Sequence, residues 1–300
     1  MFGFLAKAIM AGRFQATLVA VVFAVLALFL PPFSLISGGA IGLVTLRLGW
    51  QQGFTVAGMG ILALAALSLL VGDPMIGVAY GMSQWLPVVL LALLLRYSSS
   101  WTTAFQWSVG VLAVLVLLAH MVIPDLDAHW QSLLGQVLEP MLKQAGTEQT
   151  ADLNKIVQEV SGVMTGVLAV SILMSSMLAM FLARAWQAQL FNPGGFGEEF
   201  RALRLGNWLA VAGIALFALS VVLRQHNLQE LAILFLVPFI FQGLAVMHEL
   251  NRKFQWHAAI LIIMYVLMFI ALPQMMAMLI AMGLIDSFAD FRRRLNPKVG

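Results

Sequence analysis

Few residues of this chain have the types and spacing that catalysis requires. His248 and Glu249 stand side by side, as at the start of the His-Glu-x-x-His motif with which some proteases bind zinc. The position four residues after His248 is Arg252 instead of a second histidine, so no second imidazole shares that helical face. We therefore expect no zinc site at this position.

A second pair of candidate metal ligands is acidic. Asp286 and Asp290 are four residues apart and so share one face of a helix, where two carboxylates could hold a divalent cation. Three arginines follow at positions 292–294, and ion pairs with them are the stronger expectation, with Asp290 placed to pair with Arg294. The sequence predicts no metal site here either.

Other catalytic signatures are missing from the sequence. It contains no cysteine, which excludes disulfides, thiolate metal sites and cysteine nucleophiles. Neither the Gly-x-Ser-x-Gly motif of hydrolases nor the phosphate-binding Gly-x4-Gly-Lys-Ser/Thr motif occurs. We expect no catalytic residues, no cofactor and no enzymatic activity.

Polar side chains inside apolar segments are the candidate ligand-binding residues, because such groups are expensive in hydrocarbon and usually face a cavity or a partner. Pro87 and Pro238 lie close to some of them, and a proline frees a carbonyl that a neighbouring amide can satisfy. Two proline-broken spans could line a small-molecule site at the membrane midplane. Ordinary hydrogen bonding between helices is the alternative, and one candidate, His120, could be a simple interface residue. The candidates are Gln84, Trp85, Gln106, His120 and Gln242.

Three segments are candidates for docking a membrane or cytoplasmic protein partner. The first span carries an alanine ladder, whose small side chains would let another helix approach closely. A glycine-rich loop, in which Glu198 is expected to pair with Arg201, and the charged residues near the C-terminus could form a docking surface. For the loop, a folded connector is the alternative. The candidates are Ala16, Ala20 and Ala24; Asn192, Gly194, Gly195, Phe196, Glu199, Phe200, Arg201 and Arg204; and Asp286, Asp290 and Arg292.

The elements that must position these residues are membrane-spanning helices. Apolar residues make up 62% of the chain, charged residues 10%, and the mean hydropathy is +0.96. A soluble protein of this length needs far more polar surface. The basic residues that raise the isoelectric point to about 9.5 are scattered over the loops, so the lipid bilayer is the expected partner and nucleic acid is not.

Apolar stretches of about 20 residues, or slightly fewer, predict an all-α polytopic transmembrane bundle of about eight spans. Residues 1–123 should hold five spans, and residues 161–300 should hold the second half, with a cytoplasmic loop at 184–206 and a basic C-terminal tail. Between them, residues 124–160 form a polar insert with the pattern of two amphipathic helices, which could shield the bundle or act as a lid over a cavity. The expected spans are 14–30, 33–49, 53–72, 74–95, 102–123, 161–183, 207–223 and 231–250.

Charge predicts how the spans are threaded. The insert has a net charge of −4, whereas most other short loops carry lysine or arginine, which favours an extracytoplasmic insert and a cytoplasmic N-terminus in a bacterial inner membrane. Arg224 is the exception. A single crossing of residues 257–285 would carry the arginine triplet outside, so two short halves hinged at Pro273 are expected to fold back instead. The insert's charges are Asp125, Asp127, Glu139, Lys143, Glu148, Asp152, Lys155 and Glu159.

Several segments of the second half carry a likeness to known proteins. They are Asn192 through Gly206, Val237-Pro238-Phe239 to Gln242-Gly243-Leu244-Ala245, Leu272-Pro273-Gln274, and Gly283-Leu284-Ile285-Asp286 with Asp290-Phe291-Arg292. These segments resemble the YybS-like family of bacterial membrane proteins, which has no established activity, so the resemblance implies no catalytic residues. More remotely, the chain is similar to the membrane-embedded substrate-binding components of energy-coupling-factor vitamin transporters, which dock on an energising module through small-residue helix faces like the alanine ladder.

Two functional hypotheses follow. The first is a substrate-binding or transport component for a small solute, with a cavity near Gln84, Gln106 and Gln242 and the insert as its cover. The second is a non-enzymatic membrane scaffold, or an assembly or regulatory partner of another complex, that uses the loop from Asn192 to Gly206 and the basic tail.

Overall fold

The structure is a computed structural model that describes residues 2–142 and 147–294. Within these ranges all regular elements are helices, so the predicted all-α class is confirmed. Two parts of the sequence predictions, Lys143 of the insert and residues 295–300 of the basic tail, lie outside the described residues.

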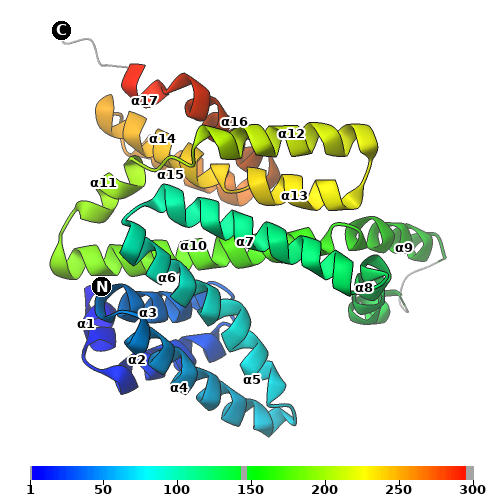
Figure 1. Ribbon diagram of the computed structural model, residues 1–300, viewed down its shortest axis with the longest axis horizontal. Helices are drawn as coiled ribbons and strands as arrows, with labels where there is room; N and C mark the ends of the chain where they lie inside the picture. Colours follow the sequence, from blue (N-terminus) through cyan, green and yellow to red (C-terminus); the bar gives the residue numbers. More distant parts are fainter. Residues whose placement is uncertain (1, 143–146, 295–300) are drawn as a thin grey trace.

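The helices fall into three groups along the chain (Figure 1). The first group is α1 (Phe2–Met10), α2 (Arg13–Leu26), α3 (Phe33–Leu48), α4 (Trp50–Ser68), η1 (Leu69–Val71), α5 (Met75–Tyr80), η2 (Gly81–Trp85), α6 (Leu86–Ser98) and α7 (Trp101–Val122). The insert holds α8 (Leu126–Leu142) and α9 (Thr147–Ser161). The last group is α10 (Met164–Phe191), α11 (Gly195–Arg201), α12 (Asn207–Leu223), α13 (His226–Leu236), α14 (Phe239–Lys253), α15 (Ala259–Ile270), α16 (Leu272–Ala289) and α17 (Phe291–Arg294).

Helices long and apolar enough to cross a membrane confirm a polytopic bundle. In the described part of the chain six helical stretches meet that length and composition, and four shorter apolar helices accompany them. Many large apolar side chains are exposed, and Phe269 on α15 is 91% exposed, which suits a surface solvated by lipid. The six are Trp50–Val71, Met75–Ser98, Trp101–Val122, Met164–Phe191, His226–Lys253 and Leu272–Ala289; the shorter ones are Arg13–Leu26, Phe33–Leu48, Asn207–Leu223 and Ala259–Ile270.

The predicted proline interruptions are present, and each takes a different form. Before Pro87 the helix widens into the π-helix η2, and Pro87 lies in the first turn of α6. Pro238 separates α13 from α14 and is the N-cap of α14. In both cases the helix is interrupted because proline has no backbone N–H with which to bond a carbonyl of the preceding turn.

Helix α10 occupies the centre of the bundle, where it packs against α3, α6, α7 and α13. Its contact with α3 depends on glycine. A Cβ atom added at Gly38 or Gly42 would lie 3.0 Å from the side chains of Ala179 and Ala183, respectively. Small residues on both helices thus allow the close approach that helix association in lipid requires.

The alanine ladder faces the interior of this protein. Ala16, Ala20 and Ala24 are buried, and α2 packs on α3 and α4. The carbonyl of Ala20 also accepts a hydrogen bond from the hydroxyl of Ser37 on α3. The prediction that this ladder docks a partner is therefore corrected: the chain's own helices cover it, because small side chains serve internal packing equally well.

The C-terminal apolar segment returns to the place where it starts. Helices α15 and α16 are separated at Ala271, and the Nζ atom of Lys253, which precedes them, donates a hydrogen bond to the carbonyl of Arg292, which follows them. The segment therefore folds back. The break lies at Ala271 and not at Pro273, because proline fits the first turn of a helix, where its missing N–H has no partner to lose.

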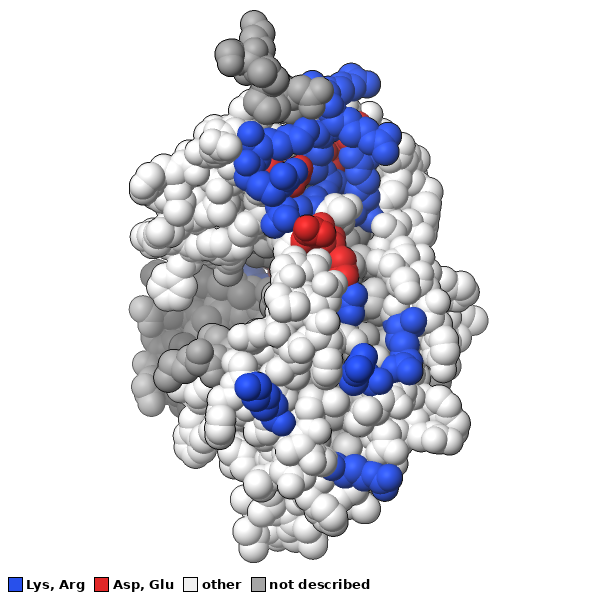
Figure 2. Space-filling model, turned by 90° about the vertical axis from the view of Figure 1, so that its left-hand side faces the viewer, with Lys and Arg blue, Asp and Glu red and all other residues white. Residues whose placement is uncertain are grey.

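The bundle has two chemically different ends. Figure 1 shows α8 and α9 at one end and α1, α11 and α17 at the other. We call the first the insert end and the second the arginine end, after Arg201, Arg204, Arg252, Arg292 and Arg293. Figure 2 looks onto the arginine end and shows lysine and arginine gathered in its upper part and scattered below.

Contacts between distant loops show that the predicted basic loops meet at the arginine end. The guanidinium of Arg47 lies 4.1 Å from the centre of the Phe191 ring, and Arg184 pairs with Glu199. The predicted exception, Arg224, lies in the turn between α12 and α13, which Figure 1 places toward the insert end. The charge alternation read from the sequence thus matches the arrangement of the helices.

Candidate functional site

The segment at residues 202–206, which joins α11 to α12, has no regular secondary structure and yet is buried in part. We call it the connector. Leu203 and Leu205 have 3% and 0% of their surface exposed. Because its backbone groups are hidden without a helix to satisfy them, they need partners from elsewhere in the protein.

Side chains from three other helices supply those partners. Arg292 donates one hydrogen bond to the carbonyl of Arg201 (2.6 Å) and another to that of Leu203 (2.8 Å). Gln106 on α7 donates to the carbonyl of Leu205 at 2.7 Å, and the N–H of Leu205 donates to Oε1 of Gln242 on α14 at 2.9 Å. The hydroxyl of Thr102 donates to the carbonyl of Arg204. Side chains from α7, α14 and α17 thus bond the backbone of the connector directly. Helix α16 contributes indirectly, because its Asp286 bonds Arg292 and Gln242.

Two of the predicted ligand-binding residues are therefore used internally. Gln106 and Gln242 were expected to line a midplane cavity, and the structure instead commits both to the connector. The other end of the Gln242 amide is also occupied, because Nε2 donates to Asp286 and Ser287. A buried primary amide can make several hydrogen bonds, and here the protein satisfies them itself.

An ion pair lies behind the connector and anchors the network. Asp286 is fully buried, and its Oδ2 atom accepts hydrogen bonds from Arg292 at 2.7 Å and from Gln242 at 2.9 Å. Arg292 is only 6% exposed. The predicted pairing of Asp286 with the arginine triplet is confirmed. A buried pair of this kind is stable only when its remaining donors and acceptors are also satisfied, as they are here by the connector.

The second aspartate makes different partners from those predicted. Asp290 accepts a hydrogen bond from Arg204 of the connector, and its carboxylate lies 3.5 Å from Nε of Arg293. The predicted pair with Arg294 does not form. A left-handed residue at Asp290 (φ 50°) ends α16 and turns the following residues, so the spacing of a continuous helix no longer applies. The hydrogen bond from Arg204 lowers the pKa of Asp290 and in turn raises the pKa of Arg204.

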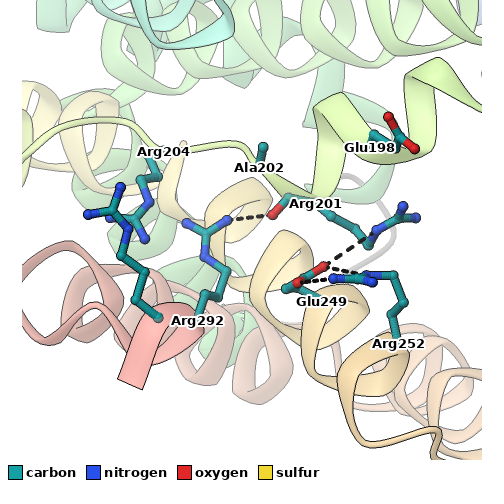
Figure 3. Close-up of a pocket in the computed structure, with 8 residues that line it drawn as sticks. Glu198, Arg201, Ala202, Arg204, Glu249, Arg252 and Arg292 are labelled. Atoms are coloured by element: carbon teal, nitrogen blue, oxygen red, sulfur yellow. Dashed lines mark hydrogen bonds and ion pairs between the residues drawn. The ribbon is translucent and has the colours of Figure 1, made fainter. Parts of the chain in front are cut away.

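In front of the network lies an open pocket of about 530 Å³ (Figure 3). Five arginines line it against two glutamates. Arg201 and Arg252 share a single carboxylate, that of Glu249, at 3.5 and 2.6 Å. Figure 3 shows the carboxylate of Glu198 pointing away from these pairs. The lining residues are Glu198, Arg201, Ala202, Arg204, Glu249, Arg252, Arg292 and Arg293.

This pocket brings together residues from each candidate docking segment except the alanine ladder. Arg201 and Arg204 come from the loop and Arg292 from the tail, while Asp286 and Asp290 stand behind them. Sequence reasoning missed Glu249, Arg252 and Arg293 as members of one site. In the sequence, the only indication was that these residues lie close to the ends of apolar segments. They meet only because α15 and α16 fold back and bring the tail to the end of α14.

The other loop residues are used mostly for packing inside the chain. Glu199 pairs with Arg184 at 2.9 Å and also accepts a weaker bond from Trp101. The rings of Phe196 and Phe200 lie 6.0 and 5.3 Å from that of Phe181 on α10. The loop from Asn192 to Gly206 is therefore folded against the bundle, as the alternative interpretation expected, and its role in docking a partner stays a prediction.

At the start of the loop the glycines serve the turn. Gly194 has a positive φ of 89°, a conformation that favours glycine, and Asn192 and Gly194 are exposed while Gly195 is half-buried. The predicted pairing of Glu198 with Arg201 is wrong, since Arg201 reaches Glu249 instead. A three-residue spacing permits a pair within one helix, but the carboxylate at the end of α14 lies closer to the guanidinium.

The remaining predicted ligand residues lie elsewhere and do not converge. Trp85 is fully buried and donates to Ser37 at 2.9 Å, and Gln84 is half-buried beside it in η2. His120 lies near the insert end, 3.4 Å from the buried carboxylate of Glu230. Glu230 was missed, although an acidic residue at the edge of an apolar span is a signal in itself.

Comparison with known proteins agrees with the membrane architecture. Neither the curated proteins nor the solved structures gave a match to the chain. The family model described as "Predicted membrane protein (DUF2232)" matches residues 18–287, which include every helix from α3 to α15 and most of α16. Because this match covers most of its length, the chain belongs to the DUF2232 family of predicted membrane proteins.

Proposed function

We propose that this protein is a non-enzymatic membrane component that binds an anionic group in the arginine-lined pocket. The observation that carries the proposal is the composition of the pocket wall, with five arginines against two glutamates. Guanidinium groups bind carboxylate and phosphate oxygens through paired, charge-assisted hydrogen bonds, so an oxyanion is the ligand that this wall suits.

The arginines differ in how far they are already committed. Arg292 is buried and bonded on all sides by Asp286 and the connector, so it supports the wall without being free to bind. Arg201 and Arg252 share Glu249, and the side chain of Arg252 is 56% exposed. The carboxylate of Glu249 is only 13% exposed, but Arg252 is exposed and Arg201 lies 3.5 Å from that carboxylate. Ion pairs with an exposed partner are weak, so an incoming oxyanion can compete for these two guanidinium groups.

The connector supports the proposal because it fixes the pocket before any ligand arrives. Arg201, Ala202 and Arg204 line the pocket, and the backbone from Arg201 to Leu205 is bonded to Arg292, Thr102, Gln106 and Gln242. A site whose backbone is already ordered loses less conformational entropy on binding.

The proposal includes a location. Basic loops favour the cytoplasmic side, so we place the arginine end in the cytoplasm of a bacterial cell and the insert outside. The more remote similarity to the substrate-binding components of energy-coupling-factor transporters supports a binding role without chemistry. A reporter enzyme that is active only outside the cytoplasm, fused after residue 138, should therefore be active. An inactive fusion would place the insert in the cytoplasm.

The test measures binding by the purified protein in neutral detergent. Inorganic pyrophosphate and, separately, dioleoylphosphatidylglycerol in mixed micelles should each be tested for a rise in the unfolding temperature. The variant is Arg201→Gln with Arg252→Gln, and the matched control is Lys7→Gln with Arg13→Gln, two exposed basic residues that do not line the pocket. Stabilisation by either probe that the variant loses and the control keeps supports the proposal. If no probe distinguishes variant from control, the proposal is wrong.

One observation favours a second candidate, a transport component for a small solute. An apolar groove of about 410 Å³ lies between α6, α7 and α10 next to η2, and π-helical turns are frequent at functional sites. Its lining includes Met82, Pro87 and Ser176 but neither Gln84 nor Gln106. Mass spectrometry of molecules that co-purify with the wild type and are lost in Leu90→Trp would support this candidate, and identical spectra would count against it.

A further inference from the structure

The arginine pocket lies at the level where several apolar helices end. Arg252 is in the last turn of the span that ends at Lys253, and Arg293 lies in α17, the short helix after α16. Arg204 lies three residues before α12 begins. Residues at such positions lie at the headgroup level of a bilayer, where basic pockets between helices meet lipid phosphates.

Aromatic side chains mark the same level. Trp256 follows Lys253 by three residues, is partly exposed, and stacks on Phe254 with ring centres 5.6 Å apart. Trp208, in the first turn of α12, is half exposed. Tryptophan is enriched at the interface between lipid and water, because its ring is apolar and its N–H needs a polar partner.

An apolar surface begins close to the pocket and continues along α15. A shallow groove of about 620 Å³ on this helix is lined by Ile262, Tyr265, Val266, Phe269 and Ile270, and Phe269 is 91% exposed. The hydroxyl of Tyr265 lies 2.8 Å from Nε2 of His248, the residue before Glu249. Tyr265 therefore connects the wall of the basic pocket with an apolar path along α15.

From this arrangement we infer that the ligand of the arginine pocket is an anionic phospholipid. This rests on the proposed function and adds the source of the anion. The lipid phosphate is bound by Arg201 and Arg252, which share one carboxylate, and an acyl chain lies along the groove on α15. A soluble phosphate would use only the first half of this site, so the chain attached to the phosphate decides the affinity.

The experiment compares three probes with the purified protein in neutral detergent, by native mass spectrometry and by competition. The probes are dioleoylphosphatidylglycerol, dioleoylphosphatidylcholine with the same chains and a zwitterionic head, and glycerol phosphate without chains. We expect phosphatidylglycerol to bind most tightly. Arg201→Gln with Arg252→Gln should weaken it about 30-fold, since each basic residue contributes about fivefold near such a surface. Val266→Ser with Phe269→Ser should weaken the lipid and leave glycerol phosphate unchanged.

Each alternative result has a defined meaning. If glycerol phosphate binds as tightly as phosphatidylglycerol and both need the two arginines, the lipid inference is overturned while the anion site stands. If phosphatidylcholine binds as tightly as phosphatidylglycerol, the charge of the head plays no part and the inference is also overturned. If the arginine variant binds every probe as the wild type does, the pocket is not the site, and both the inference and the proposed function fail.

Discussion

Among the residues whose burial the structure describes, the two ends of the bundle each bury one carboxylate, and they satisfy it very differently. At the arginine end Asp286 is fully buried and accepts hydrogen bonds from Arg292 and Gln242. At the insert end Glu230 is 1% exposed, and its Oε1 atom accepts a hydrogen bond from the N–H of Gly166 at 2.9 Å. Its Oε2 atom lies 3.4 Å from Nε2 of His120 and accepts no hydrogen bond from the described residues.

The difference shows where the fold is fixed by polar contacts and where it is not. A buried charge that loses its partner destabilises a protein strongly, whereas a loosely paired one has less to lose. The arginine end ties an irregular segment to four helices through Asp286 and its neighbours. The insert end carries α8, attached by the Trp130–Thr165 hydrogen bond and the exposed His226–Asp127 pair. We therefore expect mutations at the arginine end to be much more damaging.

The largest effect is expected for Arg292→Leu. It removes the donors for Asp286, Arg201 and Leu203 and leaves a buried carboxylate without its charge partner. The free energy of unfolding should fall by about 3–5 kcal/mol. Unfolding by SDS in mixed micelles measures this, with Arg293→Leu as the matched control, because the side chain of Arg293 is 84% exposed. Equal unfolding curves for the two variants would contradict the account of the network.

The next effect is expected for Gln242→Leu, which leaves the N–H of Leu205 and one lone pair of Asp286 unsatisfied. The loss should be about 1–3 kcal/mol, the usual penalty of a buried group without its partner. Gln84→Leu is the control, since Gln84 is half-buried in the other proline-interrupted span. Similar losses in both variants, measured by the same SDS unfolding, would show that Gln242 has no special role.

A smaller effect is expected for Glu230→Gln at the insert end. The amide oxygen can still accept from the N–H of Gly166, and the only charge partner lost is a histidine at 3.4 Å. We expect a change of about 1 kcal/mol or less. A loss as large as that of Arg292→Leu would show that the two ends are equally dependent on their buried carboxylates and would remove the contrast between them.

The smallest effect is expected for Asp290→Asn and depends on pH. The Arg204 guanidinium lowers the pKa of Asp290 below its ordinary value of 3.8, so the ionised form stabilises the folded state. This contribution is fully present above the pKa of the unfolded chain and is lost as the pH falls through the lower folded value. The wild type should therefore be more stable than the variant at pH 7, and this difference, measured from unfolding curves, should shrink as the pH falls into the acid range. A constant difference at all pH values would contradict this origin.

The sequence predicted the membrane architecture well because the hydrophobic pattern is a local signal. The spans, the acidic insert and the proline interruptions at Pro87 and Pro238 are all recognisable from a short window of residues. The pairing of Asp286 with the arginine triplet was also within reach, since six residues separate it from Arg292.

The use of Gln106 and Gln242 could not be predicted in the same way. An amide in an apolar span indicates a polar partner, but the sequence does not say whether that partner is a ligand or the chain itself. Here the partner is the connector, which is far from Gln106 in sequence, and only the tertiary fold identifies it. The grouping of Arg201, Arg252 and Arg293 depends likewise on the fold-back at Ala271. The alanine ladder was misjudged because small residues at four-residue spacing look the same on an internal face and on a docking face.

Side chains from other helices hold the connector in place, so the arginine pocket should exist before a ligand binds. Hydrogen–deuterium exchange of the ligand-free protein in detergent can show whether it does. We expect the amide of Leu205, which is in no helix, to exchange no faster than amides within α14, and amides of the helix α8 to exchange faster than both. An amide of Leu205 that exchanges as rapidly as an unprotected one, with α8 well protected, would contradict this expectation.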